Sequence, residues 1–561
     1  MTKLLKKRRI SYGNFIIFAG GMEKKLSVNT ILWLLCAASG VLLSIPWLVP
    51  HAGMVSLVAL VPLLLAEYIA AGAGIRRFWL WHYSTFVLWN ALTTFWVCNA
   101  TVGGGIFAVL ANALQMSLVF GLFRLARRRL RGALPYLLLA AAWIAWERWY
   151  LAQAEISWPW LVLGNAFATS VKDIQWYSVT GTLGGSLWVW CANLALFGTL
   201  VSLAGGRWKE WTGAARTAVC CSLALAFFAP PVISLIMYHG YEERSEKQVS
   251  VVIGQPNLDP YKKFASMTQS QQTDILLGLY EKELSKGEAK LLMAPETFTF
   301  DVLLNDIPSS PTWQRFHSFL QEHPGSDLLF GAATNELFFT ASPPSLLSYP
   351  YGNGWRMPRN SALMLSPDGT TEVFHKSKLV VGTELTPYPK IFVPLDNFLA
   401  AKFNGGSPLM ARDSGQDEIS LLHLSDGTPL GCAVCYESVY GEYCTGYASK
   451  GAGFIAVITN DSWWGNTPGY RQHLSYSCLR AIETRRDIAR CGNSGISCFI
   501  DQRGEILSRG PWWEEAVLRG TVNVNTEKSF FTLHGDIVGR VSTLVFLLLL
   551  ALLIVRFWVK N

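Results

Sequence analysis

Hydrophobic positions divide the chain into two unlike parts. From about residue 28 to residue 238 they form nearly continuous apolar segments, and a last apolar run, VSTLVFLLLLALLIV, lies near the end. A helix that spans a bilayer needs about 20 mostly apolar residues. We predict eight such helices, at about 28–49, 53–73, 78–98, 103–125, 134–152, 183–203, 217–237 and 541–559. The stretch 156–175 is also apolar, but Pro159 interrupts it, and we expect an interfacial loop there.

Residues 248–530 have a different pattern. Short β-type runs such as VSVVIGQ, AKLLMAP and GFIAVITN alternate with stretches whose apolar positions recur at helical spacing, such as SQQTDILLGLYEKELSK and YRQHLSYSCLRAIETRRDIAR. This alternation predicts stacked layers of sheet and helix. We therefore expect an N-terminal extension, a membrane part of seven spans, a soluble α/β part and a C-terminal transmembrane helix, at 1–27, 28–240, 248–530 and 541–559.

Basic residues indicate how the spans are oriented. Lys and Arg gather in every second gap between spans, for example in KKRR before the first and in RLARRRLR after the fourth. The positive-inside rule assigns these gaps, the N-terminal extension and both termini to the cytoplasm. The soluble part follows the seventh predicted span, an odd number, so we expect it on the opposite side of the membrane.

Composition agrees with a membrane protein. Of 561 residues, 51% are hydrophobic and only 15% charged, with a mean hydropathy of +0.27; soluble domains average roughly 25% charged residues. The net charge of +8 comes largely from the basic gaps, and the soluble part has no basic stripe interleaved with aromatic residues. A nucleic-acid partner is therefore not expected. Of the eleven cysteines, five lie in apolar segments, and the rest form no regular disulfide framework.

Chemically capable residues stand at the ends of predicted strands. Glu296 follows LLMAP, Lys376 follows TTEVFH and Cys435 follows LGCAV. Strand ends are where the sites of α/β proteins tend to be built. A cysteine nucleophile needs a base, and its tetrahedral intermediate needs a donor for the oxyanion. A buried glutamate and a lysine ammonium can supply both functions without a histidine.

The surrounding motifs resemble a known group of enzymes. MAPET with Glu296, FHKSKLVVGTE with Lys376 and CYES with Cys435 are similar to the Glu-Lys-Cys triad of the nitrilase superfamily. With the spans, WPWLVLGNAF, the stretch 460–501 and TLHGD, the chain resembles the apolipoprotein N-acyltransferase family over nearly its whole length beyond residue 28 or so. The resemblance implies an integral membrane α-helical bundle of about eight spans plus an α/β nitrilase-like αββα sandwich, the catalytic domain, at 248–530.

The resemblance further implies a reaction in two steps in the bacterial inner membrane, with the catalytic domain on the periplasmic side. Glu296 takes the proton of Cys435, and the thiolate attacks an acyl ester of a membrane phospholipid. The resulting thioester passes the acyl chain to the α-amine of the N-terminal diacylglyceryl-cysteine of an apolipoprotein, the last step of lipoprotein maturation. Phospholipid, apolipoprotein and lipid bilayer are the implied partners, with no cofactor and no metal.

Other residues have implied supporting roles. Lys376 and the Tyr436 backbone N–H would stabilise the oxyanion, and Glu384 and Glu437 would position the lysine and the pocket. The chain departs from the family in KLVVGTE, which lacks a Pro-Phe pair, and in the replacement of a tryptophan by Tyr261. These changes concern acyl-chain contacts more than the chemistry. Residues expected to contact substrate are Tyr261, Phe398, Leu399 and Trp463.

More than one interpretation is open for the central residues. Cys435 by itself is explained more simply as a packing residue, and with Cys432 it has the Cys-x-x-Cys spacing of redox or zinc sites. Lys378 competes with Lys376 for the lysine role, although the spacing to the glutamate eight residues on favours Lys376. His375 is expected to be a structural neighbour rather than a base.

Three further places in the chain have two interpretations each. Glu437 is either functional or a surface charge at a strand end. Residues 397–414 form either a mobile lid that touches acyl chains or an ordinary surface loop. Glu147 and Arg148, near the outer end of the fifth predicted span, are either functional or an interfacial pair.

Two other functions compete with acyl transfer. A membrane-tethered nitrilase-type amidase would hydrolyse small amides, with water in place of the amine acceptor. A transporter or receptor would only bind ligand through its soluble part. Transporters carry charged residues deep in several spans or broken helices in paired halves, whereas these spans are nearly free of charge and show no internal repeat.

Overall fold

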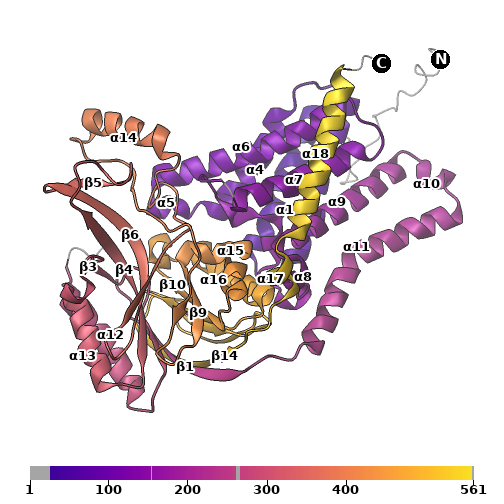
Figure 1. Ribbon diagram of the computed structural model, residues 1–561. Helices are drawn as coiled ribbons and strands as arrows, with labels where there is room; N and C mark the ends of the chain where they lie inside the picture. Colours follow the sequence, from indigo (N-terminus) through magenta and orange to yellow (C-terminus); the bar gives the residue numbers. More distant parts are fainter. Residues whose placement is uncertain (1–25, 153, 261–265, 559–561) are drawn as a thin grey trace.

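The computed structural model describes residues 26–152, 154–260 and 266–558. Along these residues the chain forms a helical bundle and a two-sheet sandwich that lie side by side (Figure 1). The last helix returns from the sandwich and packs within the bundle, against a helix some 400 positions earlier in the chain. The bundle is therefore built from both ends of the described chain, and the sandwich is inserted between its seventh and eighth predicted spans.

All eight predicted spans are helical. The helical part consists of α1 (Val28–Leu48), η2 (Gly53–Val55), α2 (Ser56–Ala59), α3 (Val61–Gly72), α4 (Trp79–Thr94), α5 (Val97–Ala100), α6 (Val102–Ala126), α7 (Leu134–Ala152), α8 (Tyr177–Thr180), α9 (Thr182–Ala204), α10 (Arg207–Glu210), α11 (Gly213–Gly240), α17 (Phe530–His534) and α18 (Ile537–Trp558). By length and composition, six helices in the described residues can cross a membrane: α1, Gly53–Gly72, α6, α9, α11 and α18. The other two predicted spans fall outside this set. Helix α4 has only 16 residues, and α7 contains a Glu-Arg pair, which lowers its mean hydropathy.

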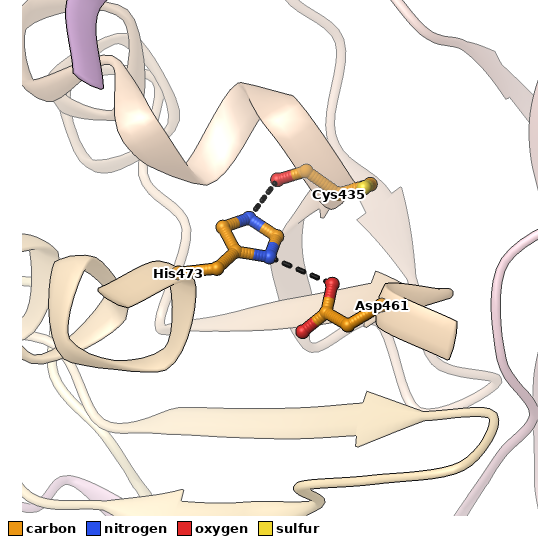
Figure 2. A group of neighbouring side chains, drawn as sticks. All are labelled: Cys435, Asp461 and His473. Carbon is orange, nitrogen blue, oxygen red and sulfur yellow. Dashed lines mark hydrogen bonds and ion pairs between the residues drawn. The ribbon is translucent and has the colours of Figure 1, made fainter. Parts of the chain in front are cut away.

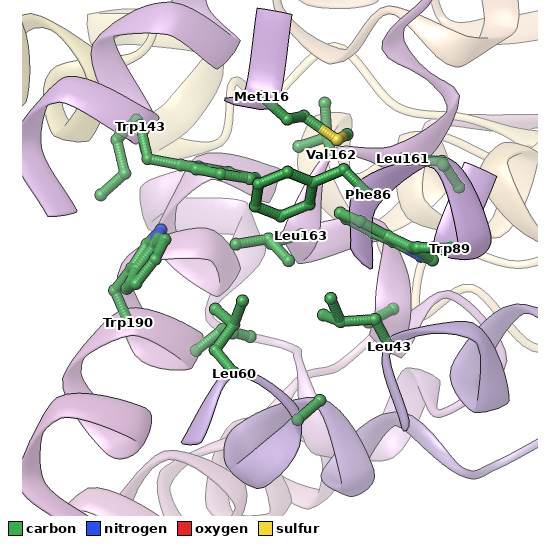
Figure 3. Packing of buried hydrophobic residues seen from close by; sticks show 14 of the residues in the cluster. Leu43, Leu60, Phe86, Trp89, Met116, Trp143, Leu161, Val162, Leu163 and Trp190 are labelled. Carbon is green, nitrogen blue, oxygen red and sulfur yellow. The ribbon is translucent and has the colours of Figure 1, made fainter. Parts of the chain in front are cut away.

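Large apolar side chains fill the middle of the bundle (Figure 3). Trp143 and Trp190 pack edge to face with their ring centroids 5.4 Å apart. The apolar stretch 156–175, expected as an interfacial loop, folds into the short helices η3 (Pro159–Leu161), η4 (Leu163–Phe167) and η5 (Val171–Asp173). Most of its apolar side chains belong to this core. Single helical turns satisfy part of the backbone, and the apolar side chains make burial favourable.

The Glu-Arg pair in α7 is not an interfacial pair. Glu147 is fully buried and accepts hydrogen bonds from the indole N–H of Trp143 at 3.0 Å and from the backbone N–H of Leu163 at 2.8 Å. Arg148 instead lies 3.9 Å from Asp536, at the start of α18. The two neighbours on α7 thus tie the helix to different parts of the chain.

The first sheet of the sandwich has eight strands. In spatial order these are β14 (Ala516–Val524), β1 (Lys247–Gln255), β2 (Leu291–Met293), β4 (Asp327–Phe338), β6 (Gly354–Leu365) and β5 (Tyr349–Tyr351), with β3 (Thr299–Leu303) beside β4 and β7 (Thr371–His375) beside β6. Helices α12 (Gln269–Leu284) and α13 (Pro311–Glu322) cover its outer face. Neighbouring β1 residues alternate between the two faces, since Val251 and Ile253 point between the sheets and Val252 points towards α12.

The second sheet has six strands. Their order is β13 (Ile506–Arg509), β12 (Cys498–Ile500), β11 (Ile488–Gly492), β10 (Phe454–Thr459), β9 (Pro429–Val434) and β8 (Leu422–His423). Its outer helices are α15 (Gly441–Ser449) and α16 (Pro468–Thr484). The helical spacing of the sequence continues to Arg490, but Arg485 adopts a left-handed conformation (φ 53°) that ends α16, and the next residues form β11. The resulting layers confirm the expected αββα sandwich.

The helices behind the second sheet also touch the bundle. Almost every residue of α16 is buried, because β-strands cover one side of it and the bundle covers the other (Figure 1). The Trp47 indole of α1 donates to the Tyr476 hydroxyl of α16 at 3.0 Å. The side-chain amide of Gln472 donates to the Trp47 carbonyl at 3.0 Å. The bundle therefore supports the layer that lies directly behind β9 and β10.

Candidate active site

Cys435 stands where the buried strand β9 ends. Strand β9 pairs in parallel with β10, so the carboxyl ends of both strands meet at one edge of the second sheet. Cys435 has a φ of 51°, a left-handed conformation that costs an L-residue about 1–2 kcal/mol. It opens the short helix η7 (Cys435–Val439), and only 9% of the residue is exposed. Strained backbone of this kind persists only where its surroundings hold it.

Glu296, Lys376 and Glu384 form one hydrogen-bonded cluster across the sheets from this cysteine. Nζ of Lys376 donates to Oε1 of Glu296 at 2.9 Å and to Oε1 of Glu384 at 2.8 Å. The Asn360 side-chain amide donates to the same two oxygens, each at 2.8 Å. The backbone N–H of Asn460, directly after β10, donates to the other oxygen of Glu296 at 3.1 Å. Both oxygens of Glu296 are therefore fixed in direction.

Cys435 is close enough to this cluster to interact with its charges. Burial and the Glu296 carboxylate raise the pKa of the Cys435 thiol well above its usual value, while the Lys376 ammonium opposes the shift. Burial disfavours the ammonium itself, but Glu296 and Glu384 outweigh that effect and raise the pKa of Lys376 well above its usual range. At neutral pH the lysine is therefore charged and the thiol neutral, and the thiol needs a base before it can act as a nucleophile.

Glu437 is not a surface charge, because it is fully buried. Its carboxylate accepts hydrogen bonds from the backbone N–H groups of Val434 at 2.8 Å and Ser377 at 2.7 Å, and from the Tyr443 hydroxyl at 2.9 Å. Burial raises the pKa of Glu437 to about 7, although these hydrogen bonds oppose the shift. Val434 precedes the candidate nucleophile and Ser377 follows the candidate lysine, so Glu437 ties the two segments together.

The structure separates the two candidate lysines. Lys376 is 1% exposed and lies in the carboxylate cluster. Nζ of Lys378 instead lies over the rings of Tyr440 and Tyr443, 5.6 and 5.7 Å from their centroids. Lys378 lines a separate cavity of about 200 Å³ between the bundle and the sandwich, together with Arg148. The geometry thus agrees with the spacing argument for Lys376.

Cys432 and His375, the near neighbours of the candidate nucleophile and lysine, are held by the two sheets. Cys432 lies inside β9 in the core between the sheets, and both it and Cys435 are free thiols. Nδ1 of His375 lies 2.7 Å from the Ser361 hydroxyl, and its backbone N–H donates to the Gln416 side chain. His375 is thus held in the first sheet as a structural neighbour of the lysine.

Tyr436, an expected oxyanion donor, and the expected substrate-contacting residues lie in different surroundings. The Tyr436 hydroxyl donates to the Ser157 carbonyl at 3.0 Å, which joins η7 to the bundle. Trp463 lies in η8 (Asp461–Trp464) and is 36% exposed. Phe398 is 64% exposed and Leu399 half-buried; both lie in the last two turns of α14 (Pro389–Phe403), where the segment expected as a lid begins. Tyr261 lies outside the described residues.

A second charged group faces the carbonyl of Cys435 and was not among the predicted site residues (Figure 2). Nε2 of His473 lies 3.1 Å from the Cys435 carbonyl oxygen, and Nδ1 lies 2.8 Å from Oδ1 of Asp461. The Arg490 guanidinium donates to Oδ2 of Asp461 at 2.6 Å. Burial disfavours the Asp461 carboxylate, but the charges of His473 and Arg490 lower its pKa to about 2. In the sequence, Asp461 follows the run IAVIT at a predicted strand end, like Glu296 and Cys435. His473 and Arg490, by contrast, are only polar residues inside otherwise buried elements.

The same group has the composition of a metal site. Potential ligand atoms of Cys435, Asp461 and His473 lie within 4.8 Å of one another. Both ring nitrogens of His473, however, already face oxygen atoms at hydrogen-bond distance. A nitrogen that donates a hydrogen bond has no lone pair for a metal. The arrangement therefore fits hydrogen bonding better than metal coordination.

Two family models match the chain. The model described as carbon-nitrogen hydrolase matches residues 253–530, and the model described as the apolipoprotein N-acyltransferase N-terminal domain matches residues 39–195. The first range contains the sandwich with Glu296, Lys376 and Cys435, and the second contains much of the bundle.

Two relatives are similar over nearly their full length. An apolipoprotein N-acyltransferase of Chlorobaculum tepidum is 27% identical over 536 residues, which cover 93% of this chain and 96% of that protein. The one of Geobacter metallireducens is 27% identical over 526 residues, 90% of this chain and 92% of its own length. Among solved structures, Nit3 of Saccharomyces cerevisiae, a member of the nitrilase superfamily, aligns with 51% of this chain and 93% of its own at 14% identity and a TM-score of 0.36.

Proposed function

Since the chain belongs to the apolipoprotein N-acyltransferase family of the carbon-nitrogen hydrolase superfamily, we propose that it transfers a fatty acyl chain from a membrane phospholipid to an apolipoprotein. The acceptor is the α-amine of the N-terminal diacylglyceryl-cysteine. The observation that carries the proposal is the convergence of Glu296, Lys376 and Cys435 from three distant segments. The apolar helical bundle supports it, because both substrates are lipids and must be met at a membrane.

In the first half-reaction Glu296 takes the proton from Sγ of Cys435 as the thiolate attacks the ester carbonyl of the phospholipid. The tetrahedral oxyanion is stabilised by the charged Lys376 and by the backbone N–H of Tyr436. The carbon–oxygen bond to the glycerol then breaks, and Glu296 returns the proton to the leaving alkoxide. Lysophospholipid departs, and the acyl chain remains as a thioester on Cys435.

In the second half-reaction the neutral α-amine of the apolipoprotein attacks the thioester. Glu296 accepts a proton from the amine, and the same oxyanion donors stabilise the second tetrahedral intermediate. The carbon–sulfur bond breaks, and the proton held by Glu296 returns to the Cys435 sulfur. The amide product leaves, and the starting state is restored.

The surrounding carboxylates have positioning roles in this scheme. Glu384 binds the same ammonium as Glu296 and so holds the lysine near the reacting carbonyl. Asn360 donates to both carboxylates and limits their repulsion. Glu437 holds the lysine segment against the cysteine segment through backbone N–H groups. Removing any one of them should displace the reacting groups rather than remove a chemical step.

We place the protein in a bacterial inner membrane, with the sandwich on the periplasmic side and both termini in the cytoplasm. Five of the six helices that meet the length and composition criteria precede the sandwich, and one follows it. The two other predicted spans, α4 and α7, also precede it. An odd number of crossings therefore leads to the sandwich whether six or eight helices span, and α18 leads away from it again (Figure 1).

Residues 397–414, which begin within α14, are proposed as a lid that touches acyl chains. Their exposed side chains include Phe398 at 64%, Phe403 at 69% and Leu409 at 53%. Large apolar residues gathered on one exposed segment suit contact with lipid better than contact with water. Replacing Phe398 and Leu399 with serine should lower the rate on lipid vesicles, and an unchanged rate would exclude the lid role.

The proposal is tested by mass analysis of Cys435. The purified protein is mixed with vesicles of phosphatidylethanolamine and phosphatidylglycerol that carry labelled acyl chains. We expect an acyl adduct on Cys435 that hydroxylamine removes, and its transfer to a diacylglyceryl-cysteine peptide when that peptide is added. The variants Glu296→Gln and Lys376→Ala should form the adduct far more slowly.

The same experiment separates acyl transfer from the amidase function. An amidase would leave Cys435 unlabelled by phospholipid and would release ammonia from small amides at the same cysteine. A labelled adduct that reacts with water as fast as with the peptide would also contradict the transferase. Acylation of the peptide by a Cys435→Ala variant would remove the cysteine from the mechanism altogether.

A further inference from the structure

Two side chains hold the carbonyl oxygen of Cys435. The Ser438 hydroxyl donates to it at 2.7 Å, and Nε2 of His473 lies 3.1 Å from it. Nε2 also lies 3.0 Å from the Ser438 hydroxyl oxygen, so the ring, the hydroxyl and the carbonyl form one hydrogen-bonded group. Because a carbonyl oxygen only accepts hydrogen bonds, Nε2 is the donor in its contact with the carbonyl. The carbonyl faces the imidazole ring while the sulfur points away from it (Figure 2). His473 therefore acts on the backbone of Cys435 and not on its thiol.

His473 is itself fixed from behind. Its Nδ1 lies 2.8 Å from Oδ1 of the Asp461 carboxylate and 3.1 Å from the Arg490 guanidinium. Arg490 also donates to the other Asp461 oxygen at 2.6 Å. None of these three side chains is exposed. The ring consequently has one orientation.

Peptide geometry carries this restraint to the neighbouring donor. The carbonyl of Cys435 and the N–H of Tyr436 belong to one planar trans peptide, so they point in opposite directions. Fixing the carbonyl therefore fixes the direction of the N–H. The left-handed φ of 51° at Cys435 would otherwise favour relaxation of this peptide. A hydrogen bond to the carbonyl also polarises the peptide and strengthens its N–H as a donor.

We propose that His473 is a positioning residue for acyl transfer: by holding the Cys435 carbonyl, it aims and polarises the Tyr436 N–H that receives the oxyanion. The inference rests on the proposed function, in which that N–H is an oxyanion donor. Asp461 and Arg490 act through the ring, and Ser438 shares the carbonyl with it. His473 moves no proton in this scheme, and no bond is made or broken at its ring.

The test measures three quantities on the full-length protein in detergent micelles. These are the rate of Cys435 acylation by phosphatidylethanolamine and by a small activated ester, the KM for each donor, and the rate of Cys435 alkylation by iodoacetamide. Only acylation passes through an oxyanion. Loss of an oxyanion donor typically costs a factor of about 10²–10³ in rate. We expect His473→Ala to slow acylation about 10²-fold, with KM and alkylation each changed less than about threefold.

Two further variants keep the test independent of folding defects. His473→Gln retains an N–H that reaches the carbonyl and should recover to within about tenfold of the wild type, whereas Ser438→Ala, which leaves little empty space, should slow acylation about tenfold. The matched control is His317→Gln on α13, whose ring stacks on Trp313 at 4.8 Å on the outer face of the first sheet. It should leave all three quantities unchanged. Melting temperatures show whether each variant is folded.

Two outcomes would overturn the inference. If His473→Ala leaves the rate of acylation by the ester unchanged, the carbonyl needs no such restraint. Alkylation that falls by the same factor as acylation would assign the histidine to the sulfur or to the fold. The two proposals fail separately: a wild-type protein that accepts acyl groups from the ester but not from phospholipid contradicts the proposed function, while the ester measurements still decide the role of His473.

Discussion

Two charged clusters meet at Cys435, and they differ in origin and exposure. The acid–lysine cluster (Glu296, Asn360, Lys376 and Glu384) comes from the first sheet and the segments that follow its strands. The histidine cluster (Asp461, His473 and Arg490) comes from the second sheet and α16. The side chain of Glu384 is 15% exposed and that of Glu296 8%, whereas the histidine cluster is completely enclosed.

The difference in exposure matches the role proposed for each cluster. A group that exchanges protons with a substrate must be reachable, and the carboxylates of the acid–lysine cluster are partly exposed. A group that only restrains a backbone is most rigid when it is sealed, because its ion pairs then face little competition from water. The candidate site thus separates proton transfer from positioning between its two sheets.

The largest expected effect comes from the residue that both clusters share. Cys435→Ser should lower acyl transfer on the order of 10⁴-fold or more, because loss of a nucleophile removes the covalent route. The measurement is transfer of labelled acyl chains to a diacylglyceryl-cysteine peptide. The adduct should vanish from the mass spectrum as well. Retained turnover in this variant would show that neither cluster surrounds a nucleophile.

The next effect compares one cation from each cluster. Lys376→Met should slow acylation about 10³-fold, because it removes an oxyanion donor and leaves two carboxylates facing each other. Arg490→Met should cost mainly stability, about 3 kcal/mol in the free energy of unfolding, because the Asp461 carboxylate loses its buried partner. Rates and unfolding curves are measured on both variants. A rate loss at Arg490 larger than that at Lys376 would reverse the proposed division.

Glu437, which joins the segments of the two clusters, should make stability depend on pH. Burial raises its pKa in the folded protein to about 7 from an ordinary value of 4.5. Its contribution to stability is complete below pH 4.5 and is lost as the pH rises through 7, because ionisation is unfavourable in the fold. Relative to Glu437→Gln, which cannot ionise, the wild type should lose about 3 kcal/mol of unfolding free energy over that interval.

The Glu437 prediction is measured by unfolding both proteins in detergent at several pH values. The glutamine variant has nearly the same volume and serves as its own packing control. Identical pH dependence in the two proteins would mean that folding leaves the pKa of Glu437 at its ordinary value, with its four hydrogen-bond donors balancing burial.

The smallest effect is expected at Lys378, the matched control for Lys376. The two lysines are two positions apart, but only Lys376 contacts the carboxylates. Lys378→Ala should change the acylation rate by less than about threefold. The contacts of this partly exposed lysine with aromatic rings contribute about 0.5–1 kcal/mol or less. A loss greater than tenfold would connect the cavity that Lys378 lines with the reaction.

Much of the fold follows from periodicity. The apolar segments predicted the helices of the bundle, and short β-type runs predicted strands such as β1, β9 and β10. Local patterns did not predict where α16 ends. The helical spacing of the sequence runs to Arg490, but the helix ends earlier because the residues from Ile488 on pair as β11 with β10. The apolar stretch around Pro159 lies inside the bundle and not at its surface.

The site was predictable in part for the same reason. Glu296, Lys376 and Cys435 stand at strand ends, where the chain leaves a buried run and a polar residue is conspicuous. Asn360 and His473 lie within a strand and a helix, and nothing in their local sequence distinguishes them from other buried polar residues. Their partners are Glu296, 64 positions away, and Cys435, 38 positions away.

The sequence by itself determined which segments are apolar enough for a membrane, which residues are able to react, and the parity from which we propose that the sandwich lies opposite both termini. These properties depend on composition, spacing and chain order, which are local or additive along the chain. Only the tertiary structure decided which lysine meets the carboxylates, that Glu437 is buried, and that His473 holds the Cys435 carbonyl. Those contacts depend on sheet order, register and helix packing, which bring distant residues together through interactions that no local pattern encodes.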